Sequence, residues 1–168
     1  LKGMSSIEKL NYFLKAALGE IFRSRKMGIF SLRLVEINLT DNCQCCCKHC
    51  YATMNGPKYE LKMHEITPLL DEMSKIRVPE VCFTGGEPLL HPSIFQLISY
   101  AFNRHLFVRL ITNGLLLDEN TVLKLKQAGL GWCSVSLDGP NADIHDDFRG
   151  YPGCFEKVIQ GIQYLISN

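Results

Sequence analysis

The sequence lacks an excess of charge of either sign. Its 168 residues contain 18 lysines and arginines against 17 aspartates and glutamates, which gives a formal net charge of +1. Because there is no global basic field, nucleic acid is excluded as the main partner. The sequence also lacks an apolar run near the roughly 18 residues that cross a bilayer, so we expect no transmembrane segment. Lys15 and Glu20 break the apolar stretch 10–22, which therefore does not resemble a secretory signal.

Cysteine is too scarce for a disulfide-dense small protein, but it is unevenly distributed. Five of the eight cysteines lie within positions 43–50, and the other three are scattered through apolar surroundings. Cysteines this close in sequence cannot easily pair with one another, because a disulfide requires a suitable separation and direction of the two side chains. The cluster therefore indicates metal ligation. Metal-binding thiols indicate a reducing compartment, so we expect a cytoplasmic protein.

The spacing of apolar residues divides the chain into an N-terminal helical extension, residues 1–28, and a core, residues 29–168. We expect the amphipathic helix of the extension to pack on the core, although a membrane-surface helix would show the same pattern. In the core, strands are predicted at 32–39, 80–83, 106–111 and 132–137, and helices at 67–76, 92–102, 118–128 and 155–166.

One helix start and one helix end are predicted from residues that are typical of these positions. Thr67 is expected to be the N-cap of the first core helix, with Pro68 at its first helical position, and Gly129 is expected to end the third. Four strand–helix units in a row predict an α/β fold with a parallel sheet and right-handed crossovers.

Polar or glycine-rich segments follow all four predicted strands. The cysteines follow the first strand, residues 84–88 the second, residues 112–114 the third, and the fourth runs into residues 134–140. In parallel α/β folds the active site forms at the carboxyl ends of the strands. We therefore expect these four segments to build one composite site.

The cysteine cluster allows several ligand sets. Two abutting C-x2-C pairs could bind zinc, but zinc sites of this kind separate their pairs by roughly 12–20 residues. A Cu(I) site is chemically possible, but it does not need the three other loops. The remaining set, Cys43, Cys47 and Cys50, suits a [4Fe–4S] cluster with one iron left without a protein ligand. The extra thiols of Cys45 and Cys46 could be alternative ligands or sites of oxidation, and we interpret them as packing.

The C-x3-C-x2-C spacing, with His49 before the last cysteine, resembles the signature of the radical SAM superfamily. The sequence Gly-Gly-Glu-Pro at 85–88 resembles the second motif of that family, and the similarity covers roughly residues 32–166. The resemblance implies a partial TIM barrel, of which about four of the usual six strand–helix units are present. We therefore expect a fragment whose missing C-terminal region covers the open edge of the sheet.

The resemblance implies that Cys43, Cys47 and Cys50 hold the cluster as metal ligands and catalytic residues, while S-adenosylmethionine (SAM) chelates the fourth iron. It further implies that Arg149 pairs with the methionine carboxylate, which a guanidinium matches at two points. The implied cofactor-binding residues are His49, Gly85, Gly86, Glu87, Thr112, Asn113, Ser136, Asp138 and Arg149.

Simpler roles remain open for some of these residues. Glu87 and Asp138 could each cap a helix or turn, and Arg149 could form a surface ion pair. Thr112 and Asn113 could belong to an ordinary turn.

The resemblance also implies a function. An electron donor of the flavodoxin or ferredoxin type reduces the cluster, SAM is cleaved, and the resulting 5′-deoxyadenosyl radical abstracts a hydrogen from the substrate. Residues 136–140, followed by His145, Arg149 and Gly150, resemble the subgroup with SPASM-type C-terminal domains, so we expect a peptide or protein substrate. The alternatives are a cofactor precursor, such as a heme or molybdopterin intermediate, and a non-catalytic iron–sulfur module. The 85–88 motif and Arg149 favour an enzyme, because only an enzyme needs to bind SAM.

Overall fold

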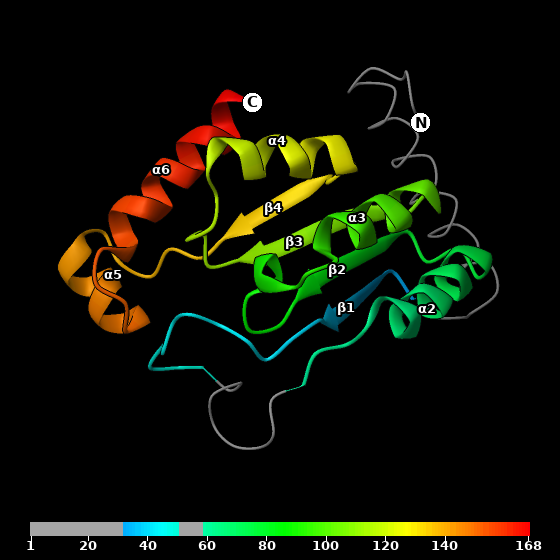
Figure 1. The fold of residues 1–168 in the computed structure, drawn as a ribbon, viewed down its shortest axis with the longest axis horizontal. Helices are drawn as coiled ribbons and strands as arrows, with labels where there is room; N and C mark the ends of the chain where they lie inside the picture. The colour runs from blue at the N-terminus through cyan, green and yellow to red at the C-terminus, as the bar shows by residue number, and fades with distance from the viewer. Residues whose placement is uncertain (1–31, 51–58) are drawn as a thin grey trace, which may run out of the picture.

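The computed structural model describes residues 32–50 and 59–168 (Figure 1). The predicted N-terminal helix lies outside these residues, so the boundary at residue 28 stays a prediction. Four strands form one parallel sheet in which each strand pairs with its neighbour in sequence. They are β1 (Leu34–Asn38), β2 (Glu80–Thr84), β3 (Phe107–Thr112) and β4 (Trp132–Val135).

Five α-helices and one short 3-10 helix connect or follow these strands in the described part of the chain. Helices α2, α3 and α4 lie on the same face of the sheet (Figure 1). This arrangement follows from sequential strand order with crossovers of one hand, as in a barrel, and it confirms the predicted fold class. The helices are α2 (Met63–Lys75), η1 (Pro88–Leu90), α3 (Ile94–Asn103), α4 (Glu119–Ala128), α5 (Ala142–Arg149) and α6 (Cys154–Ser167).

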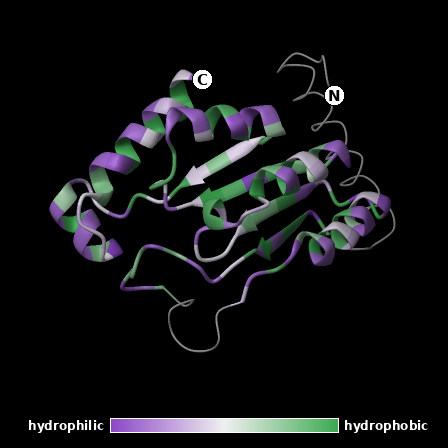
Figure 2. Cartoon of the chain, in the orientation of Figure 1, coloured by the Kyte–Doolittle hydropathy of each residue, from purple (hydrophilic) through white to green (hydrophobic). Residues whose placement is uncertain are grey.

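The core lies between the sheet and the helices. Phe83 pairs in register with Leu110, both are fully buried, and both belong to one apolar cluster with residues of α2, α3 and α4. Their sequence neighbours point to the opposite face, because side chains alternate along a strand. Figure 2 shows the hydrophobic colour on β2 and β3 and a mixture of both colours along the helices. Within the described residues, no helix combines the length and hydropathy needed to cross a membrane.

Helix α2 begins earlier than predicted. Its N-cap is Lys62, whose main-chain N–H donates to the Glu65 carboxylate over 2.6 Å, so Thr67 is not the cap. Pro68 lies inside the helix rather than at its first position. The first turn contains the apolar residues Met63 and Ile66, but a threonine followed by a proline imitates a later helix start. Burial of Ile66 in the core outweighs the one main-chain hydrogen bond that Pro68 cannot donate.

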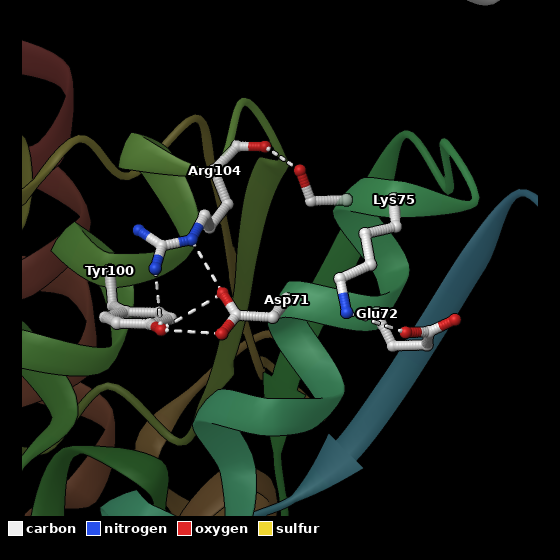
Figure 3. A network of polar contacts seen from close by, with 6 residues as sticks. Asp71, Glu72, Lys75, Tyr100 and Arg104 are labelled. Carbon is white, nitrogen blue, oxygen red and sulfur yellow. Dashed lines mark hydrogen bonds and ion pairs between the residues drawn. The ribbon is translucent and has the colours of Figure 1, made fainter.

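A polar network joins the outer surfaces of α2 and α3 (Figure 3). Arg104 Nε lies 2.6 Å from Asp71 Oδ1, and the Tyr100 hydroxyl donates to the same carboxylate over 3.0 Å. The Ser74 hydroxyl donates to the carbonyl oxygen of Arg104 over 2.9 Å. The Arg104 guanidinium and the Tyr100 hydroxyl hold the pKa of the Asp71 carboxyl below its usual value. This network links α2 to α3, away from the carboxyl ends of the strands.

Candidate metal and cofactor site

A cavity of about 130 Å³ opens at the carboxyl ends of the strands. Every predicted site residue except Glu87 and Asp138 lines it. Thr84, from the predicted segment 84–88, also lines it. Ile111 lines it and was not predicted, although alternation from the buried Leu110 indicates its direction. The lining residues are Cys43, Cys47, His49, Cys50, Thr84, Gly85, Gly86, Ile111, Thr112, Asn113, Ser136 and Arg149. The four polar segments therefore meet at one edge, as the sequence predicts.

The cysteine loop directs its thiols to different sides. Cys43, Cys47 and Cys50 line the cavity. Cys45 is buried, which confirms packing as its role, whereas Cys46 is exposed, so the packing interpretation is wrong for that residue.

Helix α5 supports the cysteine loop from the far end of the chain. The N–H of Cys46 donates to the carbonyl of Arg149, and that of Lys48 donates to the carbonyl of Phe148, both over 3.0 Å. His49 stacks on the Phe148 ring with centroids 4.8 Å apart. The last carbonyls of a helix have no partner within the helix, and here the loop supplies it. Helix α5 was not predicted, because its sequence is polar and lacks an apolar stripe.

The glycine pair after β2 packs against the chain just before the cysteines. Gly85 has φ +131°, which disfavours any side chain, and a Cβ there would lie 2.6 Å from the Thr40 carbonyl oxygen. A Cβ on Gly86 would lie 2.5 Å from the Asn42 carbonyl oxygen. The Gly86 N–H donates to Thr40 over 2.6 Å. Both glycines therefore fix the approach to the cysteine loop as well as lining the cavity.

Glu87 points into the protein interior, not into the cavity. Its carboxylate accepts hydrogen bonds from the Thr112 hydroxyl and the Asn113 N–H, both over 2.7 Å, and from the Leu89 N–H over 3.0 Å. The last of these caps η1, which is the simpler role considered for Glu87. Burial raises the pKa of the Glu87 carboxyl to about 7, because the cost of removing the charge from water exceeds the effect of these donors. A contact of Glu87 with the cofactor stays a prediction.

Thr112 and Asn113 hold the turn after β3 in place. The Asn113 side-chain amide donates to Gln44 Oε1 over 3.2 Å and lies 3.6 Å from Cys43 Sγ. The Thr112 hydroxyl accepts from the Gly114 N–H over 3.1 Å. These contacts tie the third loop to the first. Contacts of Thr112 and Asn113 with the cofactor stay predictions.

Arg149 lies at the side of the cavity, at the C-terminal end of α5. Its Nε atom lies 2.5 Å from Asp138 Oδ2, and its Nη1 atom lies 3.5 Å from Cys47 Sγ. The Arg149 side chain is only 8% exposed, so this is not a surface ion pair. Asp138 contacts Arg149 rather than the cavity. It therefore orients a cavity residue without lining the cavity.

The donor set fits an iron–sulfur cluster. Hydrogen bonds from Cys45 lower the pKa of the Cys43 thiol to about 6, with help from Asn113 and the Arg149 charge, so this group is a thiolate near neutral pH. Among residues 32–50 and 59–168, no three His, Cys, Asp or Glu side chains converge closely enough to hold one metal ion. Three cysteines around one cavity suit a larger cluster, in which each thiolate binds a different iron.

Residues 37–168 match the family model of the radical SAM superfamily. The chain is 37% identical over 145 residues to the AdoMet-dependent heme synthase of Oleidesulfovibrio alaskensis, covering 85% of this chain and 37% of that enzyme. It is 42% identical over 135 residues to the AdoMet-dependent heme synthase of Methanosarcina barkeri, covering 79% of this chain and 39% of that enzyme. The chain therefore spans less than half of the length of these relatives.

The fold is shared with Streptococcus suis SuiB, whose solved structures hold S-adenosylmethionine or the precursor peptide SuiA. The SAM-bound structure matches with a TM-score of 0.71 at 20% identity, covering 92% of this chain and 36% of SuiB. At this identity the likeness concerns the fold alone.

Proposed function

Because the chain belongs to the radical SAM superfamily, we propose that it forms the cofactor-binding part of a radical SAM enzyme. The observation that carries this proposal is the cavity in which three cysteine thiols meet the Gly85–Gly86 segment and Arg149. When bound, a reduced [4Fe–4S] cluster and SAM supply a carbon radical that removes hydrogen from a substrate.

Different residues around the cavity would bind the cluster and SAM. Cys43, Cys47 and Cys50 would hold the cluster through three of its irons, and SAM would bind at the iron without a protein ligand. The main chain at Gly85 and Gly86, which also lines the cavity, would help to hold SAM. Arg149 offers its charge to the carboxylate, since its side chain is already fixed beside the cavity by Asp138.

For the substrate, we propose a tetrapyrrole precursor of heme. The support is the identity of 37% and 42% to two AdoMet-dependent heme synthases across most of this chain. The SPASM-like motifs predict a peptide or protein substrate instead. A heme precursor was one of the alternatives to that prediction.

A peptide substrate is the second candidate. Its support is the resemblance of residues 136–150 to the SPASM-type subgroup, together with a fold shared with SuiB, which has been solved with its precursor peptide. In both candidates the electron donor is a flavodoxin or ferredoxin.

The test of the cofactor proposal is electron paramagnetic resonance of anaerobically reconstituted, dithionite-reduced protein, with and without SAM. We expect a [4Fe–4S]⁺ signal that changes when SAM is added, because SAM occupies the open iron. A cluster signal that ignores SAM would support the non-catalytic iron–sulfur module instead.

A second experiment separates the two substrates. A chain extended to the length of the heme synthases is incubated with SAM, reductant and either an iron-porphyrin precursor or a cysteine-containing peptide. Release of 5′-deoxyadenosine above the background with the porphyrin alone supports the first candidate. The same increase with the peptide alone supports the second.

A further inference from the structure

His145 is a fully buried side chain on the inner side of α5, one helical turn before Arg149. Its Nδ1 atom lies 3.1 Å from the main-chain nitrogen of Asp138, and its Nε2 atom lies 3.4 Å from the sulfur of Cys154. A main-chain N–H can only donate, so Nδ1 must be the acceptor. The proton of the neutral ring is then on Nε2, which donates to Cys154.

Two contacts tie Asp138 to the same helix. Its main-chain N–H reaches His145, and its carboxylate reaches Arg149 over 2.5 Å. Gly139 allows the loop to lie this close, because a Cβ there would be 2.8 Å from the main-chain nitrogen of His145. The position of the Asp138 carboxylate thus depends on a ring that has no contact with the cavity.

The contacts form a continuous series toward the cysteine loop. His145 accepts the main-chain N–H of Asp138, and the Asp138 carboxylate contacts Nε of Arg149. Nη1 of Arg149 in turn lies 3.5 Å from Cys47 Sγ. An arginine side chain that is already fixed loses less conformational entropy when it binds a carboxylate. An arginine without this support would have to be ordered by the ligand itself.

We infer that His145 is a positioning residue for the cofactor cavity: by accepting the Asp138 N–H, it sets the Asp138 carboxylate that orients Arg149 toward Cys47 and an incoming carboxylate. The ligand named here, SAM, rests on the proposed function. The orientation of Arg149 beside Cys47 does not.

The test uses two substitutions that each keep one side of the ring. The amide oxygen of His145→Asn can replace the Nδ1 acceptor, whereas the longer side chain of His145→Gln places its amide near the former Nε2. Cys154→Ala is the control, since it removes the Nε2 partner and leaves Nδ1 in place. All three are reconstituted with iron and sulfide, and SAM affinity is measured by titrating the EPR signal of the reduced cluster.

We expect His145→Gln to weaken SAM binding about tenfold, the lower end of the effect of losing an outer hydrogen-bond partner. His145→Asn and Cys154→Ala should bind SAM like the wild type. Hydrogen exchange of the Asp138 amide gives a readout that needs no cofactor: it should accelerate in His145→Gln and stay slow in the other two proteins.

Three results would overturn the inference. The first is wild-type SAM affinity in His145→Gln, and the second is an equal loss in all three variants, which would indicate general packing around the ring. If the wild-type EPR signal does not respond to SAM, the proposed function fails. The positioning role of His145 is then tested by comparing the cluster signals of the variants without SAM. In that case a signal altered in His145→Gln but not in His145→Asn supports it, and unaltered signals in both are the third overturning result.

Discussion

Two aspartate–arginine pairs in this protein have almost the same separation and different surroundings. Asp71 and Arg104 lie 2.6 Å apart on the outer helices, with side chains 37% and 39% exposed. Asp138 and Arg149 lie 2.5 Å apart beside the cavity, with side chains 28% and 8% exposed. Water screens the first pair, so its contribution to stability is small. The second pair is shielded from water, so its charges act strongly on their neighbours.

The contacts of each arginine explain why the two pairs have different structural roles. Arg104 lies over the Tyr100 ring of its own helix at 4.2 Å, and its main-chain carbonyl accepts from Ser74 of α2, so its contacts stabilise α3 and join it to α2. Arg149 divides its guanidinium between Asp138 and the sulfur of Cys47. The same chemical pair therefore fastens two helices in one region and orients a cavity residue in the other.

Among substitutions that compare the cavity with the outer helices, one in the cysteine loop is expected to have the largest effect. Cys47→Ala should lose most of the iron after reconstitution, because it removes one of three cluster ligands. The double substitution Cys45→Ala and Cys46→Ala should keep it, and so should Arg104→Ala. The measurement is iron and sulfide per chain. Equal loss of iron in the double variant would show that the extra thiols are ligands.

Exchanging the two arginines for alanine is expected to have the next largest effect. Arg149→Ala should weaken SAM binding about tenfold to a hundredfold, the range expected for losing a charge-assisted hydrogen bond. Arg104→Ala should leave SAM binding unchanged. SAM titration followed by EPR measures both. Equal affinities in the two variants would contradict a cofactor role for Arg149.

The buried carboxyl of Glu87 predicts a stability that falls as the pH rises. The unfolded carboxyl ionises near 4.5, whereas the folded one keeps its proton until about 7. Between these values the folded state binds more protons, so the free energy of unfolding should fall by about 1.4 kcal/mol per pH unit at most. Glu87→Gln should flatten this slope, although it starts from lower stability because its amide faces a donor. Urea unfolding from pH 4.5 to 7 measures the slope, and an unchanged slope would contradict the raised pKa.

The exposed carboxyl of Asp71 predicts the opposite sign and the smallest effect. Its pKa is lowered in the folded state, so its contribution is present above the unfolded value of 3.8 and disappears as the pH falls through the folded value. Asp71→Asn should lower the thermal midpoint slightly at pH 7 and not at all in strong acid. A drop of equal size at both pH values would indicate a loss of packing rather than of charge.

The sequence allowed the sheet and the location of the site to be predicted because both depend on local patterns. Short apolar segments between the helical patterns indicated the four strands, and polar segments after each strand indicated one shared edge. The start of α2 could not be predicted, because Thr67 and Pro68 imitate a helix start. Helix α5 was missed because it is held by contacts to distant residues, such as that of Phe148 with Lys48, rather than by an apolar stripe.

The direction of individual side chains was the hardest part to predict. Glu87 belongs to a motif associated with ligand binding, yet three donors and complete burial hold it inside. Ile111 was overlooked although its direction follows from strand alternation, because attention to polar motifs left out the strand residue before the third segment.

The contact between α5 and the cysteine loop also sets an order of events during synthesis. Cys47 and Arg149 are 102 residues apart, and the loop donates two main-chain hydrogen bonds to carbonyls at the end of α5. Under the proposed function, a nascent chain that has left the ribosome only as far as β2 carries Cys43, Cys47 and Cys50 but not the α5 carbonyls that their loop binds. The loop would then reach its final conformation, and the cluster its finished site, only after α5 has been translated.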